Sequence, residues 1–169
     1  MSILEMKPMT KVYHELEPIY NEKSKVLILG TMPSPKSREI GFYYGHPQNR
    51  FWKVLSLIFD VSFETKEEKI QFLLNKHIAL WDVVSSCTIE GASDSTISDV
   101  VPNDIASLLD KTQISSIFTT GKKADALYQK YIYPKTHIKS ICLPSTSPAN
   151  CAVKEETLIE AYQSIVKYL

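Results

Sequence analysis

The stretch VLILG, residues 26–30, decides the fold class of this chain. Four aliphatic residues that end in a glycine are typical of a strand buried on both faces, as in parallel sheets covered by helices. Three more runs of this kind follow, IALWDVV at 78–84, SSIFTTG at 115–121 and HIKSICL at 137–143. The sequence therefore predicts an α/β fold with a central, mainly parallel, four-stranded sheet.

Stretches of helical periodicity separate these runs. Residues 49–59 place five large apolar side chains on one helix face, namely Phe51, Trp52, Leu55, Ile58 and Phe59. Further helices are expected at 66–76, 103–109, 122–131 and 154–169. Because strands and helices alternate, we expect helices on both faces of the sheet. The residues between 31 and 47, and those that follow Val84, are expected to form loops.

The composition indicates one domain. The chain has 169 residues, of which 44% are hydrophobic and 22% charged, as expected for a single core spanning 1–169. No apolar run approaches the roughly 20 residues that cross a bilayer, so no membrane association is predicted. The first residues, MSILEMKPMTK, lack the basic end and apolar stretch of a secretory signal. We expect a cytoplasmic protein.

The sequence favours neither a metal site nor a cofactor. The three cysteines and four histidines show no C-x-x-C pair and no H-E-x-x-H spacing. The segment TTGKK at 119–123 lacks the first glycine of a nucleotide-binding phosphate loop, and no G-x-S-x-G elbow of a serine hydrolase is present. Nucleotide hydrolysis and serine-hydrolase chemistry are therefore disfavoured.

Two unusual loops follow predicted strands, GTMPSPKS at 30–37 and LPSTSPAN at 143–150. In open parallel sheets, the site forms at the carboxyl ends of the strands. Two such loops side by side would offer small hydroxyls and free amides to a phosphodiester backbone. Each loop taken alone is equally well explained by the ordinary preference of proline and serine for loops.

Four segments together match the motifs of a known family. GTMPSPKS, GFYYGHPQNRFWKVL at 41–55, LWDVVSSC at 80–87 and LPSTSPAN resemble, in this order, motifs of the uracil-DNA glycosylase superfamily. YYGHPQNRFW with LPSTSPAN looks like its hypoxanthine-DNA (deoxyinosine) glycosylase branch, and GFYYGHPQNRFWKV is also similar to the mismatch-specific uracil/thymine branch. The resemblance implies a three-layer α/β/α domain that flips a deaminated base out of DNA and hydrolyses its N-glycosidic bond.

The base pocket needs apolar walls and a group that reads the base edge. The aromatic run at 42–44 could supply walls, and the resemblance places Tyr44 where a ring stacks on the extruded base. Thr31 and Met32 are expected to border the base. The resemblance places Asp82 at the base edge, where a carboxylate would accept the N–H of hypoxanthine or uracil and repel the lone pair of adenine or cytosine. A strand-end aspartate that caps a loop explains Asp82 equally well.

Catalysis is where the sequence departs from the better-known branches. The water-activating Asp or Asn of those branches is replaced here by Met32, and a histidine common in the second motif is replaced by Leu143. The resemblance to the hypoxanthine branch points to Asn49 as the essential polar residue. An amide is a poor base, so we expect Asn49 to position water and sugar while the base leaves first. The residue could instead cap the helix that it opens.

DNA binding is expected along the two Pro-Ser loops and a basic rim. The candidate contacts are Ser34, Lys36, Lys122, Lys123, Ser145, Thr146 and Ser147. Ser147 occupies the place of the family's usual leucine wedge. The nineteen basic and nineteen acidic residues cancel overall, but 111–154 carries seven basic and one acidic residue, whereas 61–110 carries three and nine. We therefore expect a basic side facing DNA and an acidic back, with affinity that falls with salt.

The resemblance implies a monofunctional, monomeric glycosylase that needs no cofactor and acts on DNA containing a deaminated base. No lysine matches a Schiff-base nucleophile, so hydrolysis to an abasic site is expected. Two alternatives stay open. One is a uracil or G:U/G:T mismatch-specific glycosylase, and the other is a non-catalytic module that binds DNA lesions.

Overall fold

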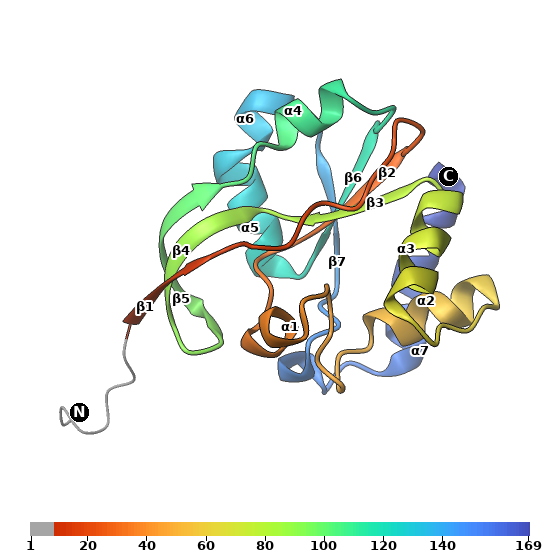
Figure 1. Ribbon diagram of the computed structural model, residues 1–169, viewed down its shortest axis with the longest axis horizontal. Coiled ribbons are helices and arrows are strands. Elements are labelled where there is room, and N and C mark those ends of the chain that lie inside the picture. Colours follow the sequence, from red (N-terminus) through yellow and green to blue (C-terminus); the bar gives the residue numbers. More distant parts are fainter. Residues whose placement is uncertain (1–8) are drawn as a thin grey trace.

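A parallel sheet forms the centre of the computed structural model, which describes residues 9–169. Its four strands lie in the order β3 (Ile78–Asp82), β2 (Val26–Gly30), β6 (Ser116–Thr120) and β7 (Ser140–Leu143), and all neighbours are parallel (Figure 1). Every residue of β2 is buried, which explains its uninterrupted apolar sequence. The predicted four-stranded parallel sheet is confirmed.

Helices cover both faces of this sheet (Figure 1). One face packs against α2 (Phe51–Phe59), α3 (Lys66–Asn75) and α7 (Glu155–Gln163), and the other against α4 (Ile105–Asp110), α5 (Lys122–Tyr131) and α6 (Tyr133–Thr136). Alternate side chains of β2 enter the two cores, Ile28 the first and Leu27 the second. The three-layer α/β/α architecture is therefore confirmed.

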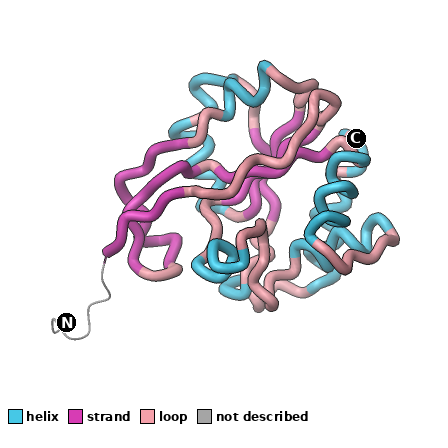
Figure 2. Tube along the Cα trace, in the orientation of Figure 1, coloured by secondary structure: helices cyan, strands magenta, loops and turns pink. Residues whose placement is uncertain are grey.

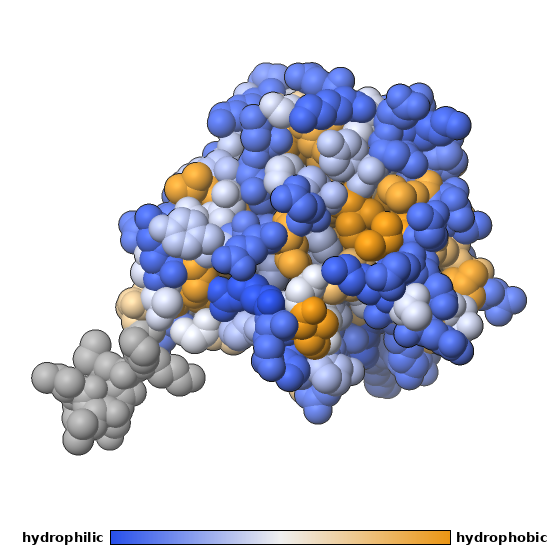
Figure 3. Space-filling model, in the orientation of Figure 1, coloured by the Kyte–Doolittle hydropathy of each residue, from blue (hydrophilic) through white to orange (hydrophobic). Residues whose placement is uncertain are grey.

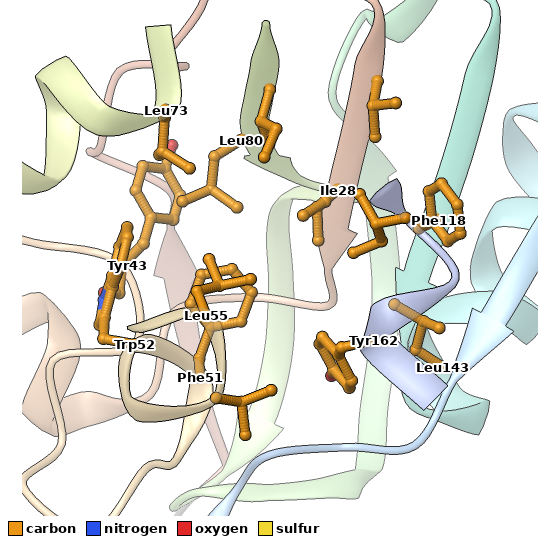
Figure 4. Packing of buried hydrophobic residues seen from close by; sticks show 14 of the residues in the cluster. Ile28, Tyr43, Phe51, Trp52, Leu55, Leu73, Leu80, Phe118, Leu143 and Tyr162 are labelled. Carbon is orange, nitrogen blue, oxygen red and sulfur yellow. The ribbon is translucent and has the colours of Figure 1, made fainter. Parts of the chain in front are cut away.

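Aromatic packing fixes the segment that leads into α2. Trp52 stacks on Phe42 with a centroid distance of 5.6 Å, and its ring N–H donates to the carbonyl of Tyr43 over 2.9 Å. Phe51 is fully buried and meets Tyr162 of α7 edge to face (Figure 4). The residues just before α2 are consequently anchored to the core.

The expected loop at 31–47 contains a short helix, α1 (Pro35–Ile40). Its start is encoded locally, because the Ser34 hydroxyl accepts from the N–H of Ser37 and a proline occupies the first turn. Gly41 ends the helix in the left-handed conformation with φ of 81°. The expectation of a loop throughout was wrong, because Ser34 and Gly41 cap a helix at its two ends.

The expectation of a polar loop after Val84 was also wrong. β4 (Val84–Glu90) and β5 (Ser93–Pro102) form an antiparallel hairpin, and β1 (Met9–Tyr13) pairs with the other edge of β4. Figure 2 shows these strands as an arm that extends from the central sheet. β5 is exposed along most of its length, so its residues are polar and do not show the apolar pattern of a buried strand.

Smaller differences between the prediction and the structure concern the ends of helices and strands. The fourth predicted strand begins only at Ser140, because α6 extends to Thr136 and its C-cap, His137, adopts a left-handed φ of 57°. The last predicted helix stops at Gln163 and is followed by a short 3₁₀ turn, Val166–Tyr168. Most of the N-terminal segment assessed for a secretory signal lies outside the described residues.

Across residues 9–169 no helix combines the length and apolar character needed to cross a membrane. On the face seen in Figure 3, hydrophilic side chains predominate and apolar side chains gather in small patches.

Candidate active site

A cavity of about 1000 Å³ opens at the carboxyl ends of the central strands. Its wall comes from the turn after β2, the loop before α2, the end of β3, the β4–β5 hairpin tip, the start of α5 and the loop after β7. The polar or aromatic lining residues include Thr31, Ser34, Arg38, Tyr43, Tyr44, His46, Asn49, Asp82, Asp94, Thr120, Lys122 and Ser145. The volume suits a nucleotide-sized ligand.

Asp82, the last residue of β3, is 3% exposed and lies beside Gly30 of β2. A side chain at position 30 would place its Cβ 2.5 Å from Oδ1 of Asp82. Only glycine leaves space for the carboxylate at this point. Gly30, at the end of β2, thus leaves space for the Asp82 carboxylate at the cavity wall.

The backbone around Asp82 is held from two sides. The Asn103 amide donates to the carbonyls of Asp82, at 2.9 Å, and Val84, at 3.2 Å. The N–H of Val83 donates to the carbonyl of Gly30 over 2.8 Å, and that of Val84 to the carbonyl of Thr31 over 3.0 Å. The passage from β3 into β4 is therefore fixed by hydrogen bonds, which fixes the Asp82 backbone.

His14, which sequence reasoning did not select, directly contacts Asp82. Its Nε2 lies 2.7 Å from Oδ2 of Asp82, and the side chains are 2% and 5% exposed, respectively. The two residues are 68 positions apart in the sequence. No spacing or motif in the sequence could have indicated this pair, because it depends on the pairing of β1 with β4.

Tyr44 lines the cavity in an uncommon backbone conformation, with φ of 53°. Its ring stacks on Phe51 with a centroid distance of 3.9 Å and an interplanar angle of 16°, and its hydroxyl lies 3.1 Å from Oγ1 of Thr120. Burial, with a smaller effect of the Asp82 charge, raises the pKa of the Tyr44 phenol well above its usual value. Because Phe51 covers one face, only the opposite face and the ring edge can border the cavity.

The other two aromatic residues of the run behave differently. Phe42 is 6% exposed and packs in the core, outside the cavity wall, which corrects its expected wall role. Tyr43 lines the cavity, but its hydroxyl donates to the carbonyl of Glu17 over 2.8 Å. Tyr43 thereby holds the segment that follows His14, a tethering role that the sequence did not reveal.

Asn49 lines the cavity and comes just before Arg50, the N-cap residue of α2. Its Oδ1 accepts from the N–H of Phe51 over 2.9 Å. Its Nδ2 makes no hydrogen bond to any of residues 9–169 and stays available to a ligand. The expected N-cap role was wrong, because Arg50 is the N-cap of α2, but the bond from Phe51 fixes the Asn49 side chain and leaves its amide NH₂ free.

The structure brings Thr31, Met32 and Leu143 to the same cavity. Thr31 is 7% exposed, and Leu143 is 2% exposed. The three side chains provide no acid or base, so this part of the wall is neutral.

The predicted serine contacts lie together, but their hydroxyls act as local caps. Ser34 accepts from Ser37, Ser145 from the N–H of Ser147 over 3.1 Å, and Ser147 from the N–H of Ala149 over 3.2 Å. The hydroxyls of Ser145 and Ser147 can still donate a proton to an acceptor, whereas that of Ser34 donates to Oγ of Ser37 over 3.1 Å. All three serines line the cavity.

Thr146 lies inside the wall, not on its rim. Its side chain is 1% exposed, and its hydroxyl has no hydrogen-bond partner among the described residues. The expected contact of this side chain with a DNA phosphate is corrected accordingly, because a phosphate outside the cavity cannot reach a buried hydroxyl.

Arg50 joins two motifs that are far apart in the sequence. Its guanidinium donates to the carbonyls of Val153, at 2.6 Å, and Asn150, at 3.1 Å, and its backbone N–H donates to the carbonyl of Thr146. The loop after β7 is thereby fastened to the start of α2, beside Asn49. Sequence reasoning assigned no role to Arg50.

The basic candidates differ in position. Lys122 lines the cavity at the start of α5, whereas Lys36 is exposed and lies 3.7 Å from Glu39. Lys123 lies close enough to Asp94 for the two charges to interact. Asp94 belongs to the acidic segment that was expected on the back, yet it lines the cavity. That part of the charge prediction was wrong, because the β4–β5 hairpin carries the segment to the site.

A nucleotide-sized cavity with a buried carboxylate, a stacked aromatic ring and hydroxyl-rich rims has the features that base-flipping enzymes need to hold a single extruded base. A model of the Uracil DNA glycosylase superfamily matches residues 17–169, and the chain belongs to this superfamily. The resemblance noted in the sequence is confirmed.

Similar proteins agree with this assignment. A hypoxanthine DNA glycosylase of Methanosarcina acetivorans is 32% identical over 78% of this chain and 84% of its own length. Another, of Methanosarcina barkeri, is 33% identical over 63% of this chain and 70% of its own length. A solution NMR structure from Methanosarcina acetivorans, provisionally described as a uracil DNA glycosylase, covers 92% of this chain and 99% of its own, with a TM-score of 0.77 and 27% identity.

Proposed function

We propose that this DNA glycosylase removes hypoxanthine from DNA by hydrolysing the N-glycosidic bond, which leaves an abasic site. The observation that carries the proposal is the convergence of Tyr44, Asn49 and Asp82 on one cavity. Met32 lines the same cavity, and the resemblance implies that the better-known branches have a water-activating Asp or Asn at its position. The names of the two Methanosarcina relatives support the same substrate.

Asp82 is proposed to select the deaminated base. An ionised carboxylate only accepts hydrogen bonds, so it can pair with N1–H of hypoxanthine. Adenine presents a lone pair at N1, which the carboxylate would repel. Tyr44 is proposed to stack on the extruded base with the ring face that Phe51 leaves free.

Asn49 is proposed as the catalytic residue. The hydrogen bond from the Phe51 N–H to its Oδ1 holds the side chain in place, and its free Nδ2 can orient water and the sugar. Because an amide is a poor base and Met32 is apolar, the base would depart before water attacks, through an oxocarbenium-like transition state. Hydroxyls of Ser34, Ser145 and Ser147, with Lys122, are proposed to hold the phosphates on either side.

A substrate panel tests the proposal. Purified protein is incubated with duplexes that carry one deoxyinosine, uracil, xanthine or G:T mismatch, and alkali-labile breaks are counted. Cleavage at deoxyinosine, lost in Asn49→Ala and kept in Asn75→Ala at the exposed end of α3, is the expected result. Preferential cleavage at uracil or G:T would reassign the substrate, and lesion-selective binding without cleavage would replace catalysis by a binding role.

The purified protein also serves to test the oligomeric state. We propose that the chain acts on DNA in the cytoplasm and as a monomer. Sedimentation at micromolar concentration would check the monomer. A dimer that persists on dilution would contradict the monomer.

A further inference from the structure

We propose that His14 is a positioning residue that donates to Asp82 and orients its carboxylate as an acceptor, and thereby sets the preference for a deaminated base over its parent. The proposal deepens the proposed function and rests on it. It starts from the buried contact between Nε2 of His14 and Oδ2 of Asp82, 2.7 Å apart.

The pair leaves acceptor positions of the Asp82 carboxylate free. His14 occupies Oδ2, and Oδ1 lies so close to the Gly30 backbone that no Cβ fits at position 30. A carboxylate offers about four acceptor positions, so one donor leaves room for a base N–H. Because an ionised carboxylate cannot donate, Nε2 of His14 must carry the proton in this pair. The imidazole donates through Nε2 whether it is neutral or protonated.

His14 itself is well fixed. Its backbone N–H donates to the carbonyl of Ser85 over 2.7 Å, which ties it to β4 next to the end of β3. Its ring lies 6.0 Å from that of Tyr43, which in turn binds the Glu17 carbonyl. A ring held on both sides can hold the carboxylate that it contacts.

No other side chain among residues 9–169 donates a hydrogen bond to the Asp82 carboxylate. The remaining titratable groups that face it are the phenols of Tyr43 and Tyr44 and the carboxylate of Asp94. Burial raises the pKa of both phenols far above the usual range, so they stay neutral, and Asp94 has the same sign of charge as Asp82. Without His14, the Asp82 carboxylate would be buried with no side-chain donor among these residues, which is costly for a charged group.

Protonation would invert what Asp82 reads. A neutral carboxyl donates a hydrogen bond, which suits N1 of adenine and not N1–H of hypoxanthine. Base excision should therefore be lost at low pH, and removing the His14 donor should move this loss to higher pH.

The test is the pH profile of single-turnover excision from a deoxyinosine duplex. We expect His14→Leu to move the acid limb upward by about one pH unit or more, and His14→Gln, whose longer amide can still donate, to restore most of the wild-type limb. His14→Asn, whose amide is too short, should behave as His14→Leu does and keeps the test usable if the leucine variant does not fold. Tyr13→Ala, at an exposed neighbouring position, is the control and should keep the wild-type limb.

The outcomes separate the two proposals. If wild-type protein releases no base from any duplex, the proposed function fails. If wild-type protein cleaves and His14→Leu and His14→Asn keep its acid limb, or His14→Gln shifts as far as they do, the positioning role of His14 is wrong while the function stands. Thermal melting at each pH shows that the variants compared are folded.

Discussion

Gly30 makes the buried Asp82 possible, and this is the tightest residue-scale constraint in the site. A Cβ added at Gly30 would lie 2.5 Å from Oδ1 of Asp82, which is shorter than any non-bonded contact between these atoms can be. The neighbouring strand cannot retreat, since Asn103 and the Gly30–Val83 hydrogen bond hold it. A substitution at Gly30 must therefore move the carboxylate.

We predict that Gly30→Ala lowers the single-turnover excision of hypoxanthine by about tenfold or more, because a displacement of about 1 Å of a reading group weakens its hydrogen bond to the base. Gly45→Ala is the matched control, since its Cβ would crowd the Phe42 carbonyl at 3.1 Å and not Asp82. Equal losses of activity in both variants would show that crowding, and not the carboxylate position, is responsible.

Tyr44 combines a stacked ring with an uncommon positive φ of 53°. A left-handed conformation costs a non-glycine residue about 1–2 kcal/mol, so the surrounding contacts must hold it. We predict that Tyr44→Ala weakens binding of deoxyinosine DNA roughly 5- to 150-fold, the equivalent of losing about 1–3 kcal/mol of base stacking. Tyr44→Phe, which loses only the contact with Thr120, should keep most of the affinity. Fluorescence titration measures both, and unchanged affinity in Tyr44→Ala would refute the stacking role.

At the scale of elements, the site depends on contacts between segments that are not neighbours in the sequence. Arg50, at the start of α2, binds two carbonyls of the loop that precedes α7, and Ser37 of α1 accepts from the N–H of Gly45 over 3.0 Å. The end of β3 is held by Asn103 at the start of the segment leading to α4. The loops around the cavity are consequently cross-linked to one another and to the sheet.

We predict that Arg50→Leu lowers the free energy of unfolding by about 1.5–3 kcal/mol, because the charge-assisted bonds to Val153 and Asn150 are lost. Arg50→Lys should recover part of the loss, since an ammonium cannot reproduce the planar fork. Lys53→Met is the control, because its ion pair with Glu155 is exposed and should contribute less than about 1 kcal/mol. Urea unfolding measures all three, and equal effects of Arg50→Leu and Lys53→Met would contradict the stabilising role of the Arg50 hydrogen bonds.

At the scale of the whole molecule, the net charge of zero hides an uneven distribution. Lys122 and Arg38 line the cavity, and so does Asp94 of the β4–β5 hairpin, which belongs to the acidic segment 61–110. The rim is therefore mixed, with an acid placed where DNA phosphates are expected to pass.

We predict that Asp94→Asn tightens DNA binding most at low salt, because a repulsive charge at the cavity is removed. Lys122→Gln should weaken binding and reduce the slope of log affinity against log salt by about one. Asp99→Asn, also on β5 but away from the cavity wall, is the control and should change neither value. Affinities measured by anisotropy across a salt series would contradict the prediction if Asp94→Asn matched Asp99→Asn.

The sequence by itself determined the central sheet, because a strand buried on both faces must be apolar along its whole length, as Val26–Gly30 is. It also indicated Tyr44, Asn49 and Asp82, because each lies in a short contiguous motif that can be identified directly in the sequence. Only the tertiary structure decided how Asp82 is held, because His14 is 68 residues away and a single histidine leaves no periodic signal. The same holds for the exposed β4–β5 hairpin, whose polar strand lacks a burial pattern, and for Arg50, whose carbonyl partners lie about 100 residues further along the chain. Local chemistry is encoded in neighbouring residues, whereas the contacts that orient it arise only when the chain folds.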